Sequence, residues 1–168
     1  MPDPRRPGHR TEMVPRGAWR AADHPRFTGP ALIDTHIWLW YLDGATDEIA
    51  IDALALLRRA VVGPGLLVSD ISVWEVGTKS AKGKLALSPS VGAWVDRAAE
   101  QPGLSFVPID RIALLASTQL PGVIHGDPVD RILIATASGA GIPLVTADRA
   151  IVEYARSTKA VSVCNART

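Results

Sequence analysis

Apolar and polar positions follow two different periods along most of this chain. Short apolar runs, which we interpret as strands, lie at about residues 31–33, 66–68, 104–107, 142–145 and 160–163. Between them are longer segments in which apolar residues recur every three or four positions, the period of a helix. Strands that alternate with helices are typical of an α/β domain, so the pattern predicts a central, mostly parallel sheet.

Capping residues mark the ends of the predicted helices. The helices begin near residues 35, 47, 70, 90, 110, 128 and 148, and the second of them extends to about residue 62. The clearest start is Asp127-Pro128, because Asp is favoured at the N-cap and Pro at the first helical position. Gly139 or Gly141 is expected to end this helix.

The first thirty residues follow neither period. They contain six prolines and six arginines. A segment of this composition buries too little apolar surface to order itself, so residues 1–30 are predicted to be a disordered leader. Residues 31–168 are predicted to form the folded domain.

Length and composition fit one domain. Hydrophobic residues make up 47% of the 168 residues, enough for one core. No apolar run is long enough to span a bilayer, and the first thirty residues lack the apolar segment of a secretory signal. We therefore expect a cytoplasmic protein without a membrane span. The single cysteine, Cys164, is expected to be a core residue.

The net charge of +1 hides an uneven distribution of charge. The leader has six arginines and three acidic residues, and 12 basic and 14 acidic residues remain from position 31 onward. The domain therefore lacks the strongly basic surface of an obligate nucleic-acid-binding protein. Any contact with RNA has to be local or assisted by a metal ion.

Four acidic residues fall near the carboxyl ends of the predicted strands. Asp34 directly follows the first strand and Asp148 comes shortly after residues 144–146 (LVT), while Glu75 and Asp130 lie in helices next to strands. Ligands of open parallel sheets bind beyond these strand ends, so we expect the four carboxylates to lie close together. Carboxylates this close repel one another unless a cation neutralises them, and oxygen ligands favour Mg²⁺ or Mn²⁺. Such an ion can activate water against a phosphodiester.

Each acid also has a purely structural explanation. Asp34 and Asp148 stand where helix N-caps are expected. Glu75 can form an ion pair with the lysine four residues later. Asp130 can complete a capping box with Asp127. Independent caps do not need to share one location in the fold, which favours a common site.

A histidine close to Asp34 in the sequence is a further candidate. His36 follows Asp34 by two residues and can hydrogen-bond a phosphate, but its helix is rich in Trp and Leu, which favours a packing role. The chain contains no Gly-x-Ser-x-Gly elbow, Walker phosphate loop or Gly-x-Gly-x-x-Gly fingerprint. The nucleophile and nucleotide chemistries that depend on those motifs are therefore not indicated.

Three segments resemble the PIN domains, and within them the VapC-like ribonuclease toxins. They are residues 32–36 (LIDTH), 69–75 (SDISVWE) and 127–137 (DPVDRILIATA), and residues 144–148 (LVTAD) follow at the expected place. Each segment alone is a weak signal. Their order and spacing across the domain are much more specific.

The resemblance implies a three-layer α/β/α fold with a divalent metal ion held by Asp34, Glu75, Asp130 and Asp148. It also implies that water attacks an RNA phosphodiester, that the protein forms a homodimer, and that the tail of a cognate antitoxin covers the cleft. These properties describe the toxin of a type II toxin–antitoxin pair.

Two further residues match the family pattern, and two features of the chain depart from it. Asp127 matches an extra acid that is common in this subgroup, and the hydroxyl of Thr146 can hold a ligand or a water. The chain departs from the pattern at Gly126, where the subgroup often has a basic residue, and in its longer leader. The phosphate contacts are therefore left open.

Two other functions remain open. A phosphatase can form an aspartyl intermediate on a first-strand aspartate, but such enzymes have a second aspartate two positions later, where this chain has His36. A PIN-like module that binds RNA or regulates without turnover is the alternative outside catalysis. The complete set of four acids argues against it.

Overall fold

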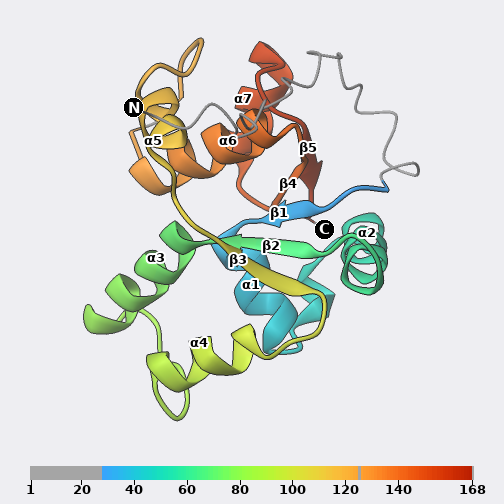
Figure 1. The fold of residues 1–168 in the computed structure, drawn as a ribbon, viewed down its shortest axis with the longest axis vertical. Helices are drawn as coiled ribbons and strands as arrows, with labels where there is room; N and C mark the ends of the chain where they lie inside the picture. The colour runs from blue at the N-terminus through green and yellow to red at the C-terminus, as the bar shows by residue number, and fades with distance from the viewer. Residues whose placement is uncertain (1–27, 125, 168) are drawn as a thin grey trace, which may run out of the picture.

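Five parallel strands form one sheet in the computed structural model, which describes residues 28–124 and 126–167 (Figure 1). The order across the sheet is β3-β2-β1-β4-β5. The parallel α/β sheet predicted from the sequence is confirmed, but the last strand lies about three residues later than predicted. The strands are β1 (Ala31–Ile33), β2 (Leu66–Ser69), β3 (Leu104–Val107), β4 (Leu144–Thr146) and β5 (Val163–Asn165).

Helices connect the strands. The helix expected from residue 47 begins only at Ile51, because the preceding residues form a short 3-10 helix and Ile49 then pairs with Arg167. Asp127 caps the sixth α-helix and Gly141, in the left-handed conformation, ends it as expected. The helical elements are α1 (Thr35–Leu42), η2 (Thr46–Glu48), α2 (Ile51–Val62), α3 (Asp70–Ala81), α4 (Val91–Ala99), α5 (Arg111–Thr118), α6 (Pro128–Ala140) and α7 (Arg149–Thr158).

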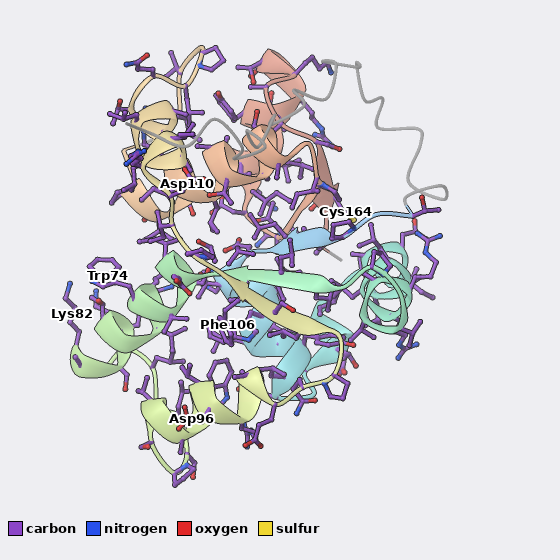
Figure 2. The ribbon with its side chains drawn as sticks, viewed as in Figure 1. Trp74, Lys82, Asp96, Phe106, Asp110 and Cys164 are labelled. Atoms are coloured by element: carbon purple, nitrogen blue, oxygen red, sulfur yellow. The ribbon has the colours of Figure 1, made fainter. Side chains whose placement is uncertain are left out.

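The sheet lies between two helical layers. Helices α1, α2 and α4 pack on one face and α6 and α7 on the other, where α5 packs against α6 (Figure 1). In β1, Ile33 packs with the first layer and Leu32 with the second, as expected for a strand buried on both faces. In the first layer, Trp38 packs edge-on against Trp94 and Phe106, with ring centroids 4.6 and 5.6 Å apart. Phe106 belongs to β3 (Figure 2).

The strand order reverses between β1 and β4. The chain builds from β1 through β2 to β3, then crosses over and adds β4 and β5 on the other side of β1. Ligands of open parallel sheets bind beyond the carboxyl ends of the two strands at such a switch point. Ile33 of β1 pairs with Val145 of β4, so the residues that follow these two strands meet at this edge.

Three expectations concern other parts of the chain. The predicted disorder of the leader falls mainly on residues 1–27, which lie outside the described residues. Within the described ranges, no helix has the length and apolar character needed to cross a membrane. Cys164 is buried in the core as expected, and burial raises the pKa of its thiol to about 11.

Candidate functional site

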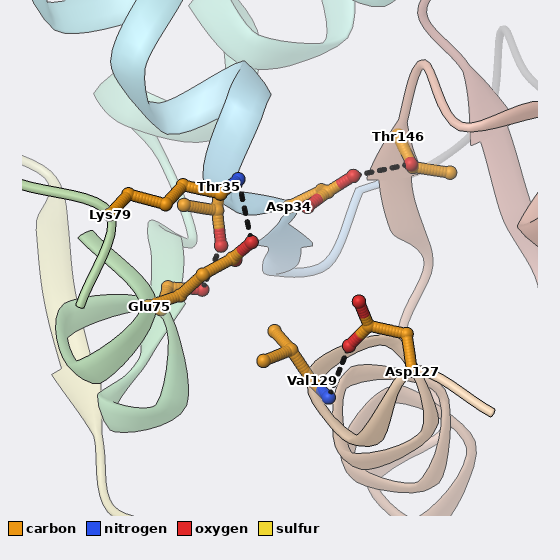
Figure 3. A network of polar contacts seen from close by, with 8 residues as sticks. Asp34, Thr35, Glu75, Lys79, Asp127, Val129 and Thr146 are labelled. Carbon is orange, nitrogen blue, oxygen red and sulfur yellow. Dashed lines mark hydrogen bonds and ion pairs between the residues drawn. The ribbon is translucent and has the colours of Figure 1, made fainter. Parts of the chain in front are cut away.

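Asp34 lies directly after β1, at the switch point. Its side chain is buried and does not cap α1, so the structural explanation for this aspartate is wrong. Instead, Asp34 Oδ2 accepts a hydrogen bond of 2.6 Å from Thr146 Oγ1 (Figure 3). The Thr146 oxygen accepts from the backbone N–H of Asp148 at 3.0 Å. The hydroxyl proton of Thr146 is therefore directed at Asp34 and fixes the orientation of its carboxylate.

Glu75 approaches the same region from α3. Its Oε1 atom forms an ion pair of 2.7 Å with Nζ of Lys79, the pairing anticipated from their spacing (Figure 3). In the same helix, Ser72 accepts a buried hydrogen bond of 2.9 Å from Thr35, which joins the start of α1 to α3. We did not predict this bond from the sequence. The only signal for it is that Ser72 lies one turn before Glu75, on the same helix face.

Asp127 and Asp148 act as helix caps. Asp127 Oδ1 accepts a hydrogen bond of 2.8 Å from the N–H of Val129 (Figure 3). Asp148 Oδ1 accepts from the N–H groups of Ala150 and Ile151 at 2.7 and 3.1 Å. The structural explanation for these two residues therefore holds. For Asp148 the capping bonds use one carboxylate oxygen, so capping does not exclude a second role for the other.

Asp130, in the first turn of α6, lies within electrostatic reach of the other acids. Burial first, and then the negative charges of Asp34, Asp127, Asp148 and Glu75, raise the pKa of Asp130 from 3.8 to about 8. Burial likewise raises the pKa of Asp34. Repulsion of this kind requires that carboxylates lie near one another. The four acids selected from the sequence therefore meet in one region, and their catalytic role stays a prediction.

These carboxylates fit a hard divalent cation by their chemistry. They offer oxygen ligands only, and their shared negative charge is the kind that Mg²⁺ or Mn²⁺ relieves. Within residues 28–124 and 126–167, no three His, Cys, Asp or Glu side chains are arranged to hold a metal ion as they stand. Glu75 is turned toward Lys79 and Asp34 toward Thr146. Binding of a cation would therefore draw Glu75 away from its present partner.

His36 is exposed, so the packing role favoured from the sequence is wrong. Its ring lies beside that of Trp40, with centroids 6.2 Å apart, and its charge lowers the pKa of Asp34. His36 also borders a hollow of about 470 Å³ between α1 and the segment that follows α3. Other residues that line this hollow are Leu39, Trp40, Lys79, Leu85 and Leu87.

Comparisons with known proteins agree on one type of domain. The sequence profile of the PIN domain matches residues 31–157. A curated protein named Ribonuclease VapC22, from Mycobacterium tuberculosis, is 29% identical over 118 residues, which cover 70% of this chain and 86% of that protein.

Two solved structures are similar to this fold. VapBC2 from Rickettsia felis, bound to a DNA fragment from its promoter, superposes with a TM-score of 0.60 at 15% identity and covers 82% of this chain and 98% of that one. The DNA-bound VapBC from Salmonella typhimurium superposes with a TM-score of 0.56 at 13% identity over the same shares of the two chains. At these identities the likeness shows a common fold.

Proposed function

Since the chain belongs to the PIN domain family, we propose that it is a divalent-metal-dependent endoribonuclease and the toxin of a toxin–antitoxin pair. The relative named Ribonuclease VapC22 supports the ribonuclease activity, and the VapBC complexes support the toxin role. The proposed nuclease domain comprises residues 31–168.

One observation carries this proposal: four carboxylates from separate segments converge at the switch point of the sheet. The pKa of Asp34 and that of Asp130 are both raised, so the metal-free folded state bears an electrostatic penalty there. Penalties of this kind are concentrated at functional sites, where they are offset by a ligand. Helix caps alone do not account for the penalty, because Asp34 caps no helix.

The four carboxylates would hold the metal ion. A bound Mg²⁺ or Mn²⁺ would supply positive charge at the scissile phosphate and make water a better nucleophile. Thr146 holds the Asp34 carboxylate in one orientation. Lys79, once Glu75 turns toward the cation, is available to contact a phosphate oxygen. Asp130, whose pKa is raised to about 8, would give up its proton on binding such a cation.

Incubation of the purified protein with cellular RNA tests the proposed activity. We expect RNA fragments with defined ends in the presence of Mg²⁺ or Mn²⁺ and no release of inorganic phosphate from a small phosphate ester. Release of phosphate from the ester would favour the phosphatase with an aspartyl intermediate. Tight RNA binding without fragments would favour the non-catalytic module.

The proposed protein partner is a cognate antitoxin. The hollow beside His36 has apolar walls formed by Leu39, Trp40, Leu85 and Leu87. Lys79 also lines it and forms the ion pair with Glu75, so the hollow lies next to the carboxylates. A segment seated in it would lie beside Glu75 and restrict access of RNA to the carboxylates. This geometry supports inhibition by a tail that covers the cleft.

A homodimer is also part of the proposal. On α5, Ile112 and Leu115 are 74% and 65% exposed, and on α3 Trp74 is 57% exposed and points away from the body of the protein (Figure 2). Both helices pack against α6. Exposed apolar side chains that lie close together mark interaction surfaces, and Ile112 and Leu115 lie one turn apart on α5. This face is therefore the proposed dimer contact.

Substitution of this face is expected to separate the dimer. The double variant Ile112→Glu/Leu115→Glu places two charges where the dimer would bury apolar side chains, so light scattering after size-exclusion chromatography should give the mass of a monomer. The matched control is Ile51→Glu/Val62→Glu, which changes two similarly exposed apolar residues of α2 and should remain dimeric. A dimeric α5 variant, or a monomeric wild type, would argue against this contact.

A further inference from the structure

Three arginines surround a second hollow, of about 320 Å³, between α7 and the end of the chain's last strand. We call it the arginine hollow. It is lined by Arg149, Val152, Glu153, Arg156, Asn165 and Arg167. Nothing in the proposed metal chemistry uses these residues.

The arginine hollow adjoins the carboxylate site. Arg149 directly follows Asp148 at the start of α7. Asn165 of β5 pairs with Thr146 of the neighbouring strand β4. Thr146 in turn donates a hydrogen bond to Asp34, which directly follows β1, the strand on the other side of β4. Neighbouring strands lie about 4.8 Å apart, so Asn165 is roughly 10 Å from Asp34.

Few carboxylates neutralise the positive charge of the arginine hollow. Its one carboxylate, Glu153, contacts Arg156 at 4.0 Å, and both side chains are exposed, so this ion pair is weak. Arg149 and Arg167 are exposed and form no ion pair with any described residue. Because the domain as a whole has slightly more acidic than basic residues, three arginines around one hollow form a local positive site. Guanidinium groups suit phosphate, which they bind through paired hydrogen bonds.

We propose that the arginine hollow binds phosphates of the RNA strand on one side of the cleaved bond, with Arg149 and Arg167 as the principal contacts. This inference rests on the proposed function for the identity of the ligand. Five of the six lining residues are polar or charged, and the sixth, Val152, is almost fully buried. Besides the aliphatic stems of the arginines, the lining offers charged and polar groups, which suit a hydrated phosphate backbone.

Binding of RNA without turnover tests the proposal. All proteins carry Asp34→Asn to prevent cleavage, and the affinity for a short, fluorescein-labelled single-stranded RNA is measured by anisotropy over a series of KCl concentrations. The test variant is Arg149→Gln/Arg167→Gln. The control is Arg58→Gln/Arg97→Gln, which removes the same charge from α2 and α4, two helices that end before the amino ends of β2 and β3. Melting temperatures of all variants check that each is folded.

We expect the test variant to bind RNA roughly tenfold more weakly than the control and to lose about 1.4 from the magnitude of the salt slope, about 0.7 for each phosphate contact removed. An affinity and slope equal to those of the control would overturn the arginine hollow as an RNA site. The proposal would also be overturned if the variant kept its RNA affinity but bound the antitoxin less tightly. The ligand of the arginine hollow would then be an acidic peptide. Neither result touches the ribonuclease proposal, which is decided by cleavage of RNA by the wild-type protein.

Discussion

Replacement of Asp34 by asparagine is expected to abolish RNA cleavage and leave the protein folded. Asparagine keeps the shape of the side chain and an oxygen that can accept from Thr146, but it removes the charge that would hold a divalent cation. Metal ions stabilise the transition state of such reactions by several kcal/mol, and about 1.4 kcal/mol corresponds to a factor of ten, so the rate should fall by roughly a thousandfold or more. Initial rates of cleavage of a labelled RNA measure this loss.

A matched control for this variant is Asp110→Asn. Asp110 (Figure 2) also follows a strand and starts a helix, and it accepts a hydrogen bond of 2.7 Å from the N–H of Ala113. It is not among the acids that raise the pKa of Asp130. Asparagine caps helices as well as aspartate does, so the rate and the melting temperature should not change. An Asp34→Asn variant that cleaves within about tenfold of the wild-type rate would refute the role of Asp34.

Asp130→Asn is expected to abolish cleavage and also to change how the stability of the metal-free protein depends on pH. The pKa of Asp130 is raised to about 8 in the folded protein, so the folded state holds this proton more tightly than the unfolded chain, whose aspartates titrate near 3.9. The stability contributed by the protonated carboxyl is complete below about pH 4 and is lost as the pH rises toward 8. In EDTA, the wild-type protein should therefore melt at a lower temperature near pH 8 than near pH 6.

The Asp130→Asn variant has no titrating group at this position. It should melt a few degrees above the wild-type protein at the alkaline end of the range and show a flatter pH profile. Asp96→Asn, which removes the charge of an exposed aspartate on α4 (Figure 2), should leave the wild-type profile unchanged. Scanning fluorimetry across the pH range provides the comparison. Identical profiles for Asp130→Asn and the wild-type protein would show that ionisation of Asp130 does not lower the stability of the folded protein.

The sequence was sufficient to predict the architecture because strands buried on both faces are short and apolar, and their alternation with helices leaves few topologies. Element boundaries were harder to predict where distant segments meet. The last strand begins at Val163 because its register with β4 pairs Asn165 with Thr146. The second helix starts late because Ile49 pairs with Arg167. Neither contact leaves a signal in the local pattern of apolar residues.

The candidate site was only partly predictable for the same reason. Its four acids could be selected because they follow strands or start helices near strand ends, and these positions are visible in the sequence. Their partners depend on the packed fold: the hydrogen bond from Thr146 to Asp34 joins β4 to the end of β1. His36 was misjudged because its helix is rich in apolar residues, although the side chain lies on the exposed side of α1. The arginine hollow exists only because β5 lies beside β4.

Calorimetric titration of the metal-free protein with Mn²⁺ tests most directly the claim that these carboxylates gather around a divalent cation. We expect a single site per chain, release of a proton on binding at neutral pH because Asp130 is protonated beforehand, and loss of binding in both Asp34→Asn and Asp130→Asn. Absence of binding to the wild-type protein, or an affinity that neither substitution changes, would contradict a shared cation site at these carboxylates.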